Sequence, residues 1–200
     1  VSGTDLYAGG SFTNAGGKEA NHIAKWDGSS WSAFGSGMNG DVLGFAFLGT
    51  DVYAGGEFTT AGGQTANRTA KWDGSSWSPL GSGMDHWVIA LAGEGRNLFA
   101  GGTFTNAGGT VANHVAKWDG QTWSPLGSGI IGGEKTKVTA LAISGAHLYA
   151  GGNFSTAGGV SANYIAKWNG SSWSALGSGL SGAVFALTVF DDGGGPALYA

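Results

Sequence analysis

The chain has 200 residues, of which 41 are Gly, 12% are aromatic and 11% are charged, and its formal net charge is −4. Nine Lys and Arg residues spread thinly along the sequence exclude the basic face of a nucleic-acid-binding protein, and no apolar run is long enough to span a membrane. The absence of Cys excludes disulfides, thiolate metal sites and Cys nucleophiles.

One unit recurs along the chain. An aromatic residue followed by Ala-Gly-Gly stands at Tyr7, Tyr53, Phe99 and Tyr149, at spacings of 46, 46 and 50 residues. The last residues, from Leu198, begin a fifth copy. Downstream, two Trp and one Asn keep their places in every copy. These recurrent residues are Trp26, Trp31, Trp72, Trp77, Trp118, Trp123, Trp168, Trp173, Asn21, Asn67, Asn113 and Asn163.

Each unit predicts four short strands. We expect first strands over 42–48, 87–92, 138–143 and 184–190, a second strand such as 51–58, a third such as 163–168 and a fourth such as 31–34. An Asp-Gly turn such as 27–28 joins the third strand to the fourth, and glycines interrupt every candidate helix. The prediction is an all-β fold, a single β-propeller domain over 1–200 with four four-stranded blades, whose units start near Asp5, Asp51, Asn97 and His147.

The recurrent side chains have a structural and a functional interpretation. The Trp residues are expected to pack between blades, the alternative being platforms that stack on carbohydrate. The Asn residues are expected to bond loop backbone, the alternative being a sugar-binding amide in each blade. Lys25, Lys71, Lys117 and Lys167 are expected to cover aromatic rings with their stems, against one anion site per blade.

The pattern of Tyr53, Gly55, Gly56, Asp73-Gly74 and Trp77 resembles the kelch repeat of the galactose-oxidase-like propellers. The longer pattern of Ala-Gly-Gly-x-Phe-Thr, then Ala-Asn-x-Ile-Ala-Lys-Trp-Asp-Gly-Ser-Ser-Trp-Ser, is similar to repeats of large exported bacterial proteins. The resemblance implies a propeller of kelch-like blades. It does not extend to the copper site of galactose oxidase, which needs a Tyr cross-linked to a Cys.

Binding residues are expected where the copies differ, because a rigid scaffold presents its function on loops. The loop between strands two and three varies at two places, the residue pair 18–19 with its counterparts and His22 with its counterparts. The longest insertion, 132–137, is charged; a tolerated insertion at a loop tip is the alternative. The candidate binding residues are His22, Arg68, His114, Tyr164, Glu134, Lys135 and Lys137. Three sequons would accept N-glycans in a suitable source, at Asn67, Asn153 and Asn169.

Identical residues in every copy argue against catalysis, which needs unlike groups at one place. No phosphate loop or calcium loop occurs, so no cofactor or metal is expected. We expect a non-catalytic protein, secreted or on a bacterial cell surface, that serves as a scaffold or adhesion module and binds protein or glycan at its loops. The alternative is a multivalent lectin with one site per blade.

Ring closure within four blades would need 184–190 to pair with 5–12, where the terminal 198–200 would compete with 6–8. This redundancy favours either further repeats or head-to-tail association of chains.

Overall fold

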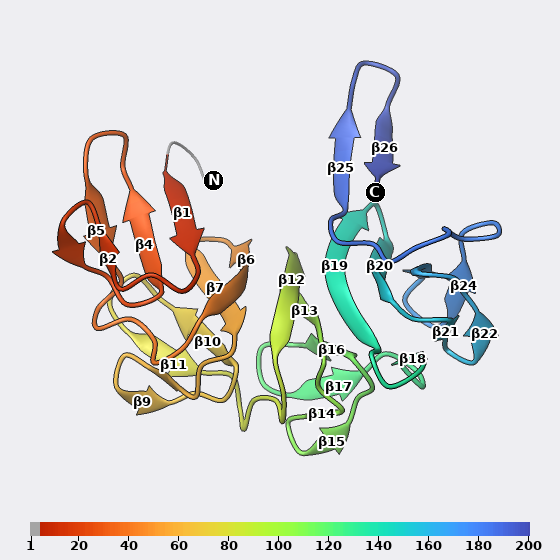
Figure 1. The fold of residues 1–200 in the computed structure, drawn as a ribbon, viewed down its shortest axis with the longest axis horizontal. Helices are drawn as coiled ribbons and strands as arrows, with labels where there is room; N and C mark the ends of the chain where they lie inside the picture. Colours follow the sequence, from red (N-terminus) through yellow and green to blue (C-terminus); the bar gives the residue numbers. More distant parts are fainter. Residues whose placement is uncertain (1–4) are drawn as a thin grey trace.

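The computed structural model describes residues 5–200, and all its regular elements in this part of the chain are β-strands. The sheets stand next to one another in chain order along an open arc, with the N-terminal sheet at one end and the C-terminal hairpin at the other (Figure 1). The chain is therefore all-β with the architecture of a β-propeller, as the repeat predicted. Residues 5–200 contain no helix that could cross a membrane.

Three of the sheets are four-stranded and antiparallel, with their strands in sequence order. The second blade has β6 (Val42–Leu48), β7 (Asp51–Gly56), β10 (Thr69–Trp72) and β11 (Trp77–Pro79). The third has β12 (Val88–Glu94), β13 (Asn97–Gly102), β16 (Val115–Trp118) and β17 (Trp123–Pro125). The fourth has β19 (Lys137–Ser144), β20 (His147–Asn153), β23 (Ile165–Trp168) and β24 (Trp173–Ala175).

The two ends of the arc differ from this pattern. Among the described residues the first blade has three strands, β1 (Leu6–Gly9), β4 (Ile23–Trp26) and β5 (Trp31–Ala33). The strand expected over 184–190 is reduced to β25 (Thr188–Asp191), which pairs with β26 (Pro196–Tyr199) and not with β1. A tight turn explains the local pairing, because Asp191 Oδ1 accepts hydrogen bonds from the backbone N–H groups of Gly193 and Gly195, at 2.9 and 3.0 Å.

The loop from strand two to strand three contains a small hairpin that the sequence did not predict. Its four copies are β2 (Asn14–Ala15) with β3 (Lys18–Glu19), β8 (Thr60–Ala61) with β9 (Gln64–Thr65), β14 (Asn106–Ala107) with β15 (Thr110–Val111), and β21 (Thr156–Ala157) with β22 (Val160–Ser161). The Gly pair of each copy forms the turn; Gly62 and Gly63 have φ of +59° and +79°, which suits a two-residue hairpin turn. A further short strand, β18 (Ile130–Ile131), pairs with β21.

The recurrent Trp residues of strand four join each blade to the one before it. Trp77 donates its indole N–H to the carbonyl oxygen of Phe34 at 3.0 Å, and the equivalent bonds of Trp123 and Trp173 measure 2.9 and 2.8 Å. Each of these rings also packs on the Trp that faces it across the strand three to strand four hairpin, as Trp118 does with Trp123 at a centroid distance of 5.3 Å. Each buried cluster therefore joins the residues of one blade to a few residues of the preceding blade.

The Gly pairs of strand two allow close approach of the neighbouring backbone. A Cβ atom on Gly55 would lie 2.5 Å from Val88 Cγ1 of the next blade. A Cβ atom on Gly56 would lie 2.0 Å from the carbonyl oxygen of Asp41 in its own blade. Neither position has room for a side chain.

Candidate functional site

The four variable residues of the strand two to three loop share one backbone conformation. His22, Arg68, His114 and Tyr164 have φ between 64° and 66°, the left-handed region in which an L side chain costs about 1 kcal/mol or more. The loop turns there into strand three. Four bulky side chains at a place that suits Gly or Asn point to a role for these side chains, because such strain is typically kept at functional positions.

The surroundings of these four side chains differ from blade to blade. His22 Nδ1 lies 3.0 Å from the carbonyl oxygen of Gly10 and 3.1 Å from Asp41 Oδ1. Arg68 donates from its guanidinium to the carbonyl oxygen of Glu57. Among residues 5–200 the buried Nδ1 atom of His114 has no hydrogen-bond partner, and burial lowers the pKa of this imidazole. Burial thus favours the neutral form of His114.

The 132–137 insertion forms an ordered loop. Thr136 donates its backbone N–H and its hydroxyl to the carbonyl oxygen of Gly133, at 3.1 and 2.7 Å. Asn153 donates its side-chain amide to the carbonyl oxygen of Lys135 at 3.0 Å. The loop is thus held both by its own turn and by strand β20.

This loop separates two hollows at the same end of the blades. The larger, of about 550 Å³, lies between the third and fourth blades. It is lined by His86, Thr103, Thr105, His114, Gly133, Glu134, Lys135, Thr136, Lys137 and Asn153. The smaller, of about 410 Å³, lies on the other side of the loop. Its lining is Gly132, Gly133, Glu134, Lys135, Asn153, Phe154, Ser155, Asn163 and Tyr164. We call the two together the loop surface.

The structure brings together five of the seven candidate binding residues. His114, Glu134, Lys135 and Lys137 line the larger hollow, and Tyr164 lines the smaller one with Glu134 and Lys135. His22 and Arg68 belong to earlier blades and line neither hollow.

The loop surface also contains side chains outside the candidate set. His86 Nδ1 lies 2.6 Å from Thr103 Oγ1, and both line the larger hollow. Trp87 is 38% exposed beside His86, at a ring-centroid distance of 5.0 Å. His86 and Trp87 stand in the strand four to one loop, where the copies differ, so their variability is the signal that indicates them.

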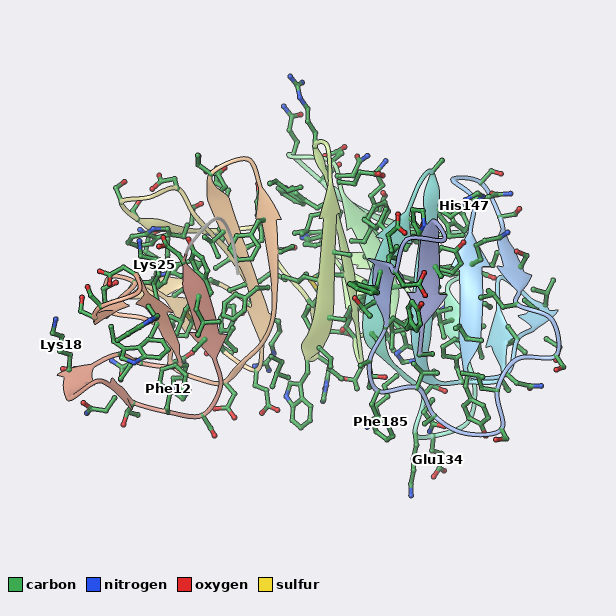
Figure 2. All side chains as sticks on the ribbon, turned by 90° about the horizontal axis from the view of Figure 1, so that it is seen from above. Phe12, Lys18, Lys25, Glu134, His147 and Phe185 are labelled. Atoms are coloured by element: carbon green, nitrogen blue, oxygen red, sulfur yellow. The ribbon has the colours of Figure 1, made fainter. Side chains whose placement is uncertain are left out.

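Charge on the loop surface departs from that of the whole chain. Lys135 and Lys137 face only one acidic residue in the larger hollow, Glu134, whereas the whole chain has a net charge of −4. In the described part of the chain neither Lys forms an ion pair. Figure 2 shows Glu134 and Phe185 at this end of the blades and His147 at the opposite end. The loop surface therefore offers cations to a partner, and the exposed ring of Trp87 lies beside it, next to His86.

Asp85 anchors the base of the same loop region. Its carboxylate accepts hydrogen bonds from the backbone and side chain of both Thr105 and Asn106, at 2.8 to 3.0 Å. Burial raises the pKa of Asp85, but these hydrogen bonds outweigh burial and lower the pKa to about 2. The equivalent Asn39 makes similar bonds to Thr59 and Thr60.

The recurrent Asn residues are engaged with backbone in every blade. They donate their amides to the carbonyl oxygens of Ser36, Ser82, Ser128 and Ser178, at 2.9 to 3.2 Å. The donors are Asn21, Asn67, Asn113 and Asn163.

The three sequons lie in different settings. The hydroxyl residue of the first, Thr69, is fully buried, and the amide of its Asn67 is already bonded. Asn153 is bonded to the insertion loop. Asn169 is exposed in the turn between strands three and four, where its Oδ1 accepts the backbone N–H groups of Ser171 and Ser172.

Comparison with known proteins agrees with the architecture. No curated protein matches the chain. Among solved structures, the crystal structure of the computationally designed Ika4 protein superposes with a TM-score of 0.50 at 20% identity, covering 82% of this chain and 92% of that one. At this identity the likeness shows the fold alone. Residues 1–145 match the family model described as the Rax2 C-terminal beta propeller domain. Since this match covers well over half of its length, the chain belongs to the Rax2 C-terminal beta propeller family.

Proposed function

We propose that the chain is a non-catalytic interaction module of an exported or cell-surface assembly, and that it binds its partner through the loop surface. The observation that carries this proposal is the contrast between the uniform scaffold and the loop surface, where side chains differ from blade to blade. A propeller domain generally serves as a scaffold for interactions, and its specificity is expected at loops. The exported location and the adhesive role are supported by the resemblance to exported repeat proteins.

The kelch-like character of the blades belongs to the same proposal. It is supported by the antiparallel four-stranded sheets and by the places of the motif residues. Gly55 and Gly56 lie where strand two meets its neighbours, and Asp73 caps the turn that leads to Trp77.

A multivalent lectin with one site per blade is the alternative function. Trp77, Trp123 and Trp173 are only 3%, 6% and 5% exposed, so their rings have no free face for a sugar. The recurrent Asn amides are bonded to backbone as described above. Trp87 is the one Trp among residues 5–200 that is exposed rather than half-buried or buried, so a glycan that stacks on it would find one site and not four.

Adhesion can be measured with beads coated with the chain and presented to intact cells of its source. We expect the double variant Lys135→Glu with Lys137→Glu to lose most of the binding. The matched control is Lys18→Glu, an exposed Lys of the small hairpin of the first blade. Equal binding by both variants and the wild type would refute a role for the loop surface.

Two further measurements separate the remaining possibilities. Cell fractionation of the native producer, probed with an antibody against the chain, would place it in the medium, on the surface or inside; an internal location contradicts the exported role. A glycan array with wild type and Trp87→Ala tests the lectin alternative. A lectin with one site per blade predicts multivalent glycan binding that does not depend on Trp87.

A further inference from the structure

The Lys–Asp ion pair of the first two blades is missing in the third and fourth blades, where Asn97 and His147 stand in place of the Asp. Lys25 Nζ lies 3.0 Å from Asp5 Oδ2, and Lys71 Nζ lies 3.1 Å from Asp51 Oδ2. The hydrogen bond to the carboxylate raises the pKa of each of these Lys residues. Lys117 occupies the same place in the third blade, but Asn97 stands where the Asp would be. Among residues 5–200 no carboxylate lies within ion-pair distance of Lys117.

Lys117 lines a hollow of about 410 Å³ between the third and fourth blades. Its walls include Phe99, Leu126, Ile143 and Trp168. His147 also lines it, and Figure 2 shows this residue at the end of the blades opposite Glu134. The hollow, which we call the aromatic slot, is therefore distinct from the loop surface. Its volume is within the range of small-molecule sites.

Comparison with the interface between the first and second blades explains why the slot exists. There Phe34 and Phe47 occupy the places that Leu126 and Ile143 hold in the slot. Aromatic rings fill that interface: Tyr7 lies 4.8 Å from Phe47 and 5.8 Å from Phe34, between centroids. Leu and Ile are smaller than Phe, so the same packing leaves space.

The interface between the second and third blades is filled in another way. Leu48 covers Gly93, whose added Cβ would lie 2.6 Å from Leu48 Cδ2. In the third blade the residue equivalent to Leu48 is Glu94, which is exposed and lines the slot instead of filling it. The third to fourth interface thus combines space, aromatic walls and a cation without its carboxylate.

We propose that the aromatic slot binds a small aromatic carboxylate, whose ring lies between Phe99 and Trp168 and whose carboxylate takes the place of the missing Asp at Lys117. A charge-assisted hydrogen bond to the ammonium orients the ligand, and burial of its ring supplies most of the affinity. The ligand is either a free aromatic acid or the C-terminal residue of a peptide that ends in an aromatic side chain.

The test is a nuclear magnetic resonance titration of the 200-residue chain with indole-3-acetate, observed at the indole N–H of Trp168. Indole-3-acetamide is the uncharged probe of the same shape. We expect a saturable shift at Trp168 with the acid and about tenfold weaker binding of the amide, since a hydrogen bond to a charged group is worth about one order of magnitude in affinity. No saturable shift at Trp168, or equal binding of both probes, would overturn the proposal.

Variants of the ion pair give the sharpest control. Lys117→Met is expected to weaken indole-3-acetate about tenfold, and Asn97→Asp to weaken it as much by restoring the pair. Lys71→Met removes the equivalent Lys of the second blade and should leave binding unchanged. Glu94→Gln removes the negative charge at the slot and should strengthen binding. Unchanged affinity in Lys117→Met, or weaker binding in Glu94→Gln, contradicts an anionic ligand.

Filling the slot tests its walls. Leu126→Phe with Ile143→Phe copies the first interface and is expected to abolish binding. If this variant does not fold, Asn97→Asp still decides the question, because Asn97 is only half-buried at the start of strand β13 and lies outside the buried core. If the dipeptide Gly-Trp binds more tightly than indole-3-acetate, the ligand is the C-terminal residue of a peptide. If indole-3-acetate binds more tightly, the ligand is a free aromatic acid. Either result supports the site. Loop-surface variants should not affect this binding, so the slot and the proposed adhesion can fail independently.

Discussion

Removal of the Trp123 side chain measures how much of the stability resides between blades. Trp123 is 6% exposed and donates its indole N–H to the carbonyl oxygen of Leu80 in the preceding blade at 2.9 Å. Burial of an aromatic side chain and the cavity left behind predict that Trp123→Ala lowers the free energy of unfolding by about 3–5 kcal/mol. Trp123→Phe keeps most of the ring but removes the indole hydrogen bond. The Leu80 carbonyl oxygen still accepts the backbone N–H of Gly83 at 3.2 Å, so we expect a loss of about 1 kcal/mol.

The chain offers a matched control at the same position of the repeat. Trp31 packs on Trp26 at 5.6 Å, much as Trp123 packs on Trp118 at 5.3 Å. Trp31 is only half-buried and makes no hydrogen bond to another blade within residues 5–200. Trp31→Ala is therefore expected to cost about 2 kcal/mol, less than Trp123→Ala.

Urea denaturation followed by circular dichroism gives the free energy of unfolding from the midpoint and slope. Hydrogen exchange of the β13 and β16 amides shows whether the third blade loosens first, since repeat proteins can unfold in parts. Equal losses for Trp123→Ala and Trp31→Ala would refute the inference that the contact of Trp123 with the preceding blade accounts for the larger loss.

Three further predictions concern other positions. Gly102→Ala places a Cβ 2.0 Å from the carbonyl oxygen of Trp87 and should prevent stable folding. Gly109→Ala has open space around its Cβ but a φ of +82°, so it should lower the free energy of unfolding by only about 1 kcal/mol. Similar losses for the two variants in thermal melts would contradict the close approach at Gly102. Tyr164→Val should lower stability more than Tyr164→Asn, because a β-branched residue tolerates φ of 65° less well than Asn does. The reverse order in urea denaturation would show that side-chain packing, and not backbone strain, determines the stability at this position. The pKa of Asp85 is lowered to about 2, so its contribution to the free energy of unfolding is present above pH 4 and is lost as the pH falls toward 2. The Asp85→Asn variant should therefore lose less stability than the wild type between pH 4 and pH 2. The same pH profile of stability in both proteins would contradict the hydrogen-bonded carboxylate.

Much of the fold could be predicted because the relevant signals are local and repeated. Strand β6 begins and ends at the predicted residues 42–48, and the Trp pairs mark the strand three to strand four hairpins in every blade. The small hairpins of the strand two to three loop were not predicted. They have only two residues per strand, too few for alternation to appear, so the Gly pair in their turns was the remaining signal.

The candidate site could be predicted in part for the same reason. Variation against a uniform background indicated His114, Tyr164 and the 132–137 insertion, all of which line the loop surface. The left-handed backbone of His114 and Tyr164 was not predicted, because no local pattern requires it of these side chains.

The sequence by itself determined the number of repeats, their strands and the absence of disulfides, since these depend on spacing and residue type within one copy. Only the tertiary structure decided which copies leave space between them. Leu126 and Ile143 are ordinary apolar residues in the sequence, and each belongs to a different blade. Whether they fill an interface depends on what faces them across it, where Phe34 and Phe47 close the first interface and the smaller side chains leave the aromatic slot beside Lys117. Packing between blades is a property of pairs distant in sequence, which no single repeat contains.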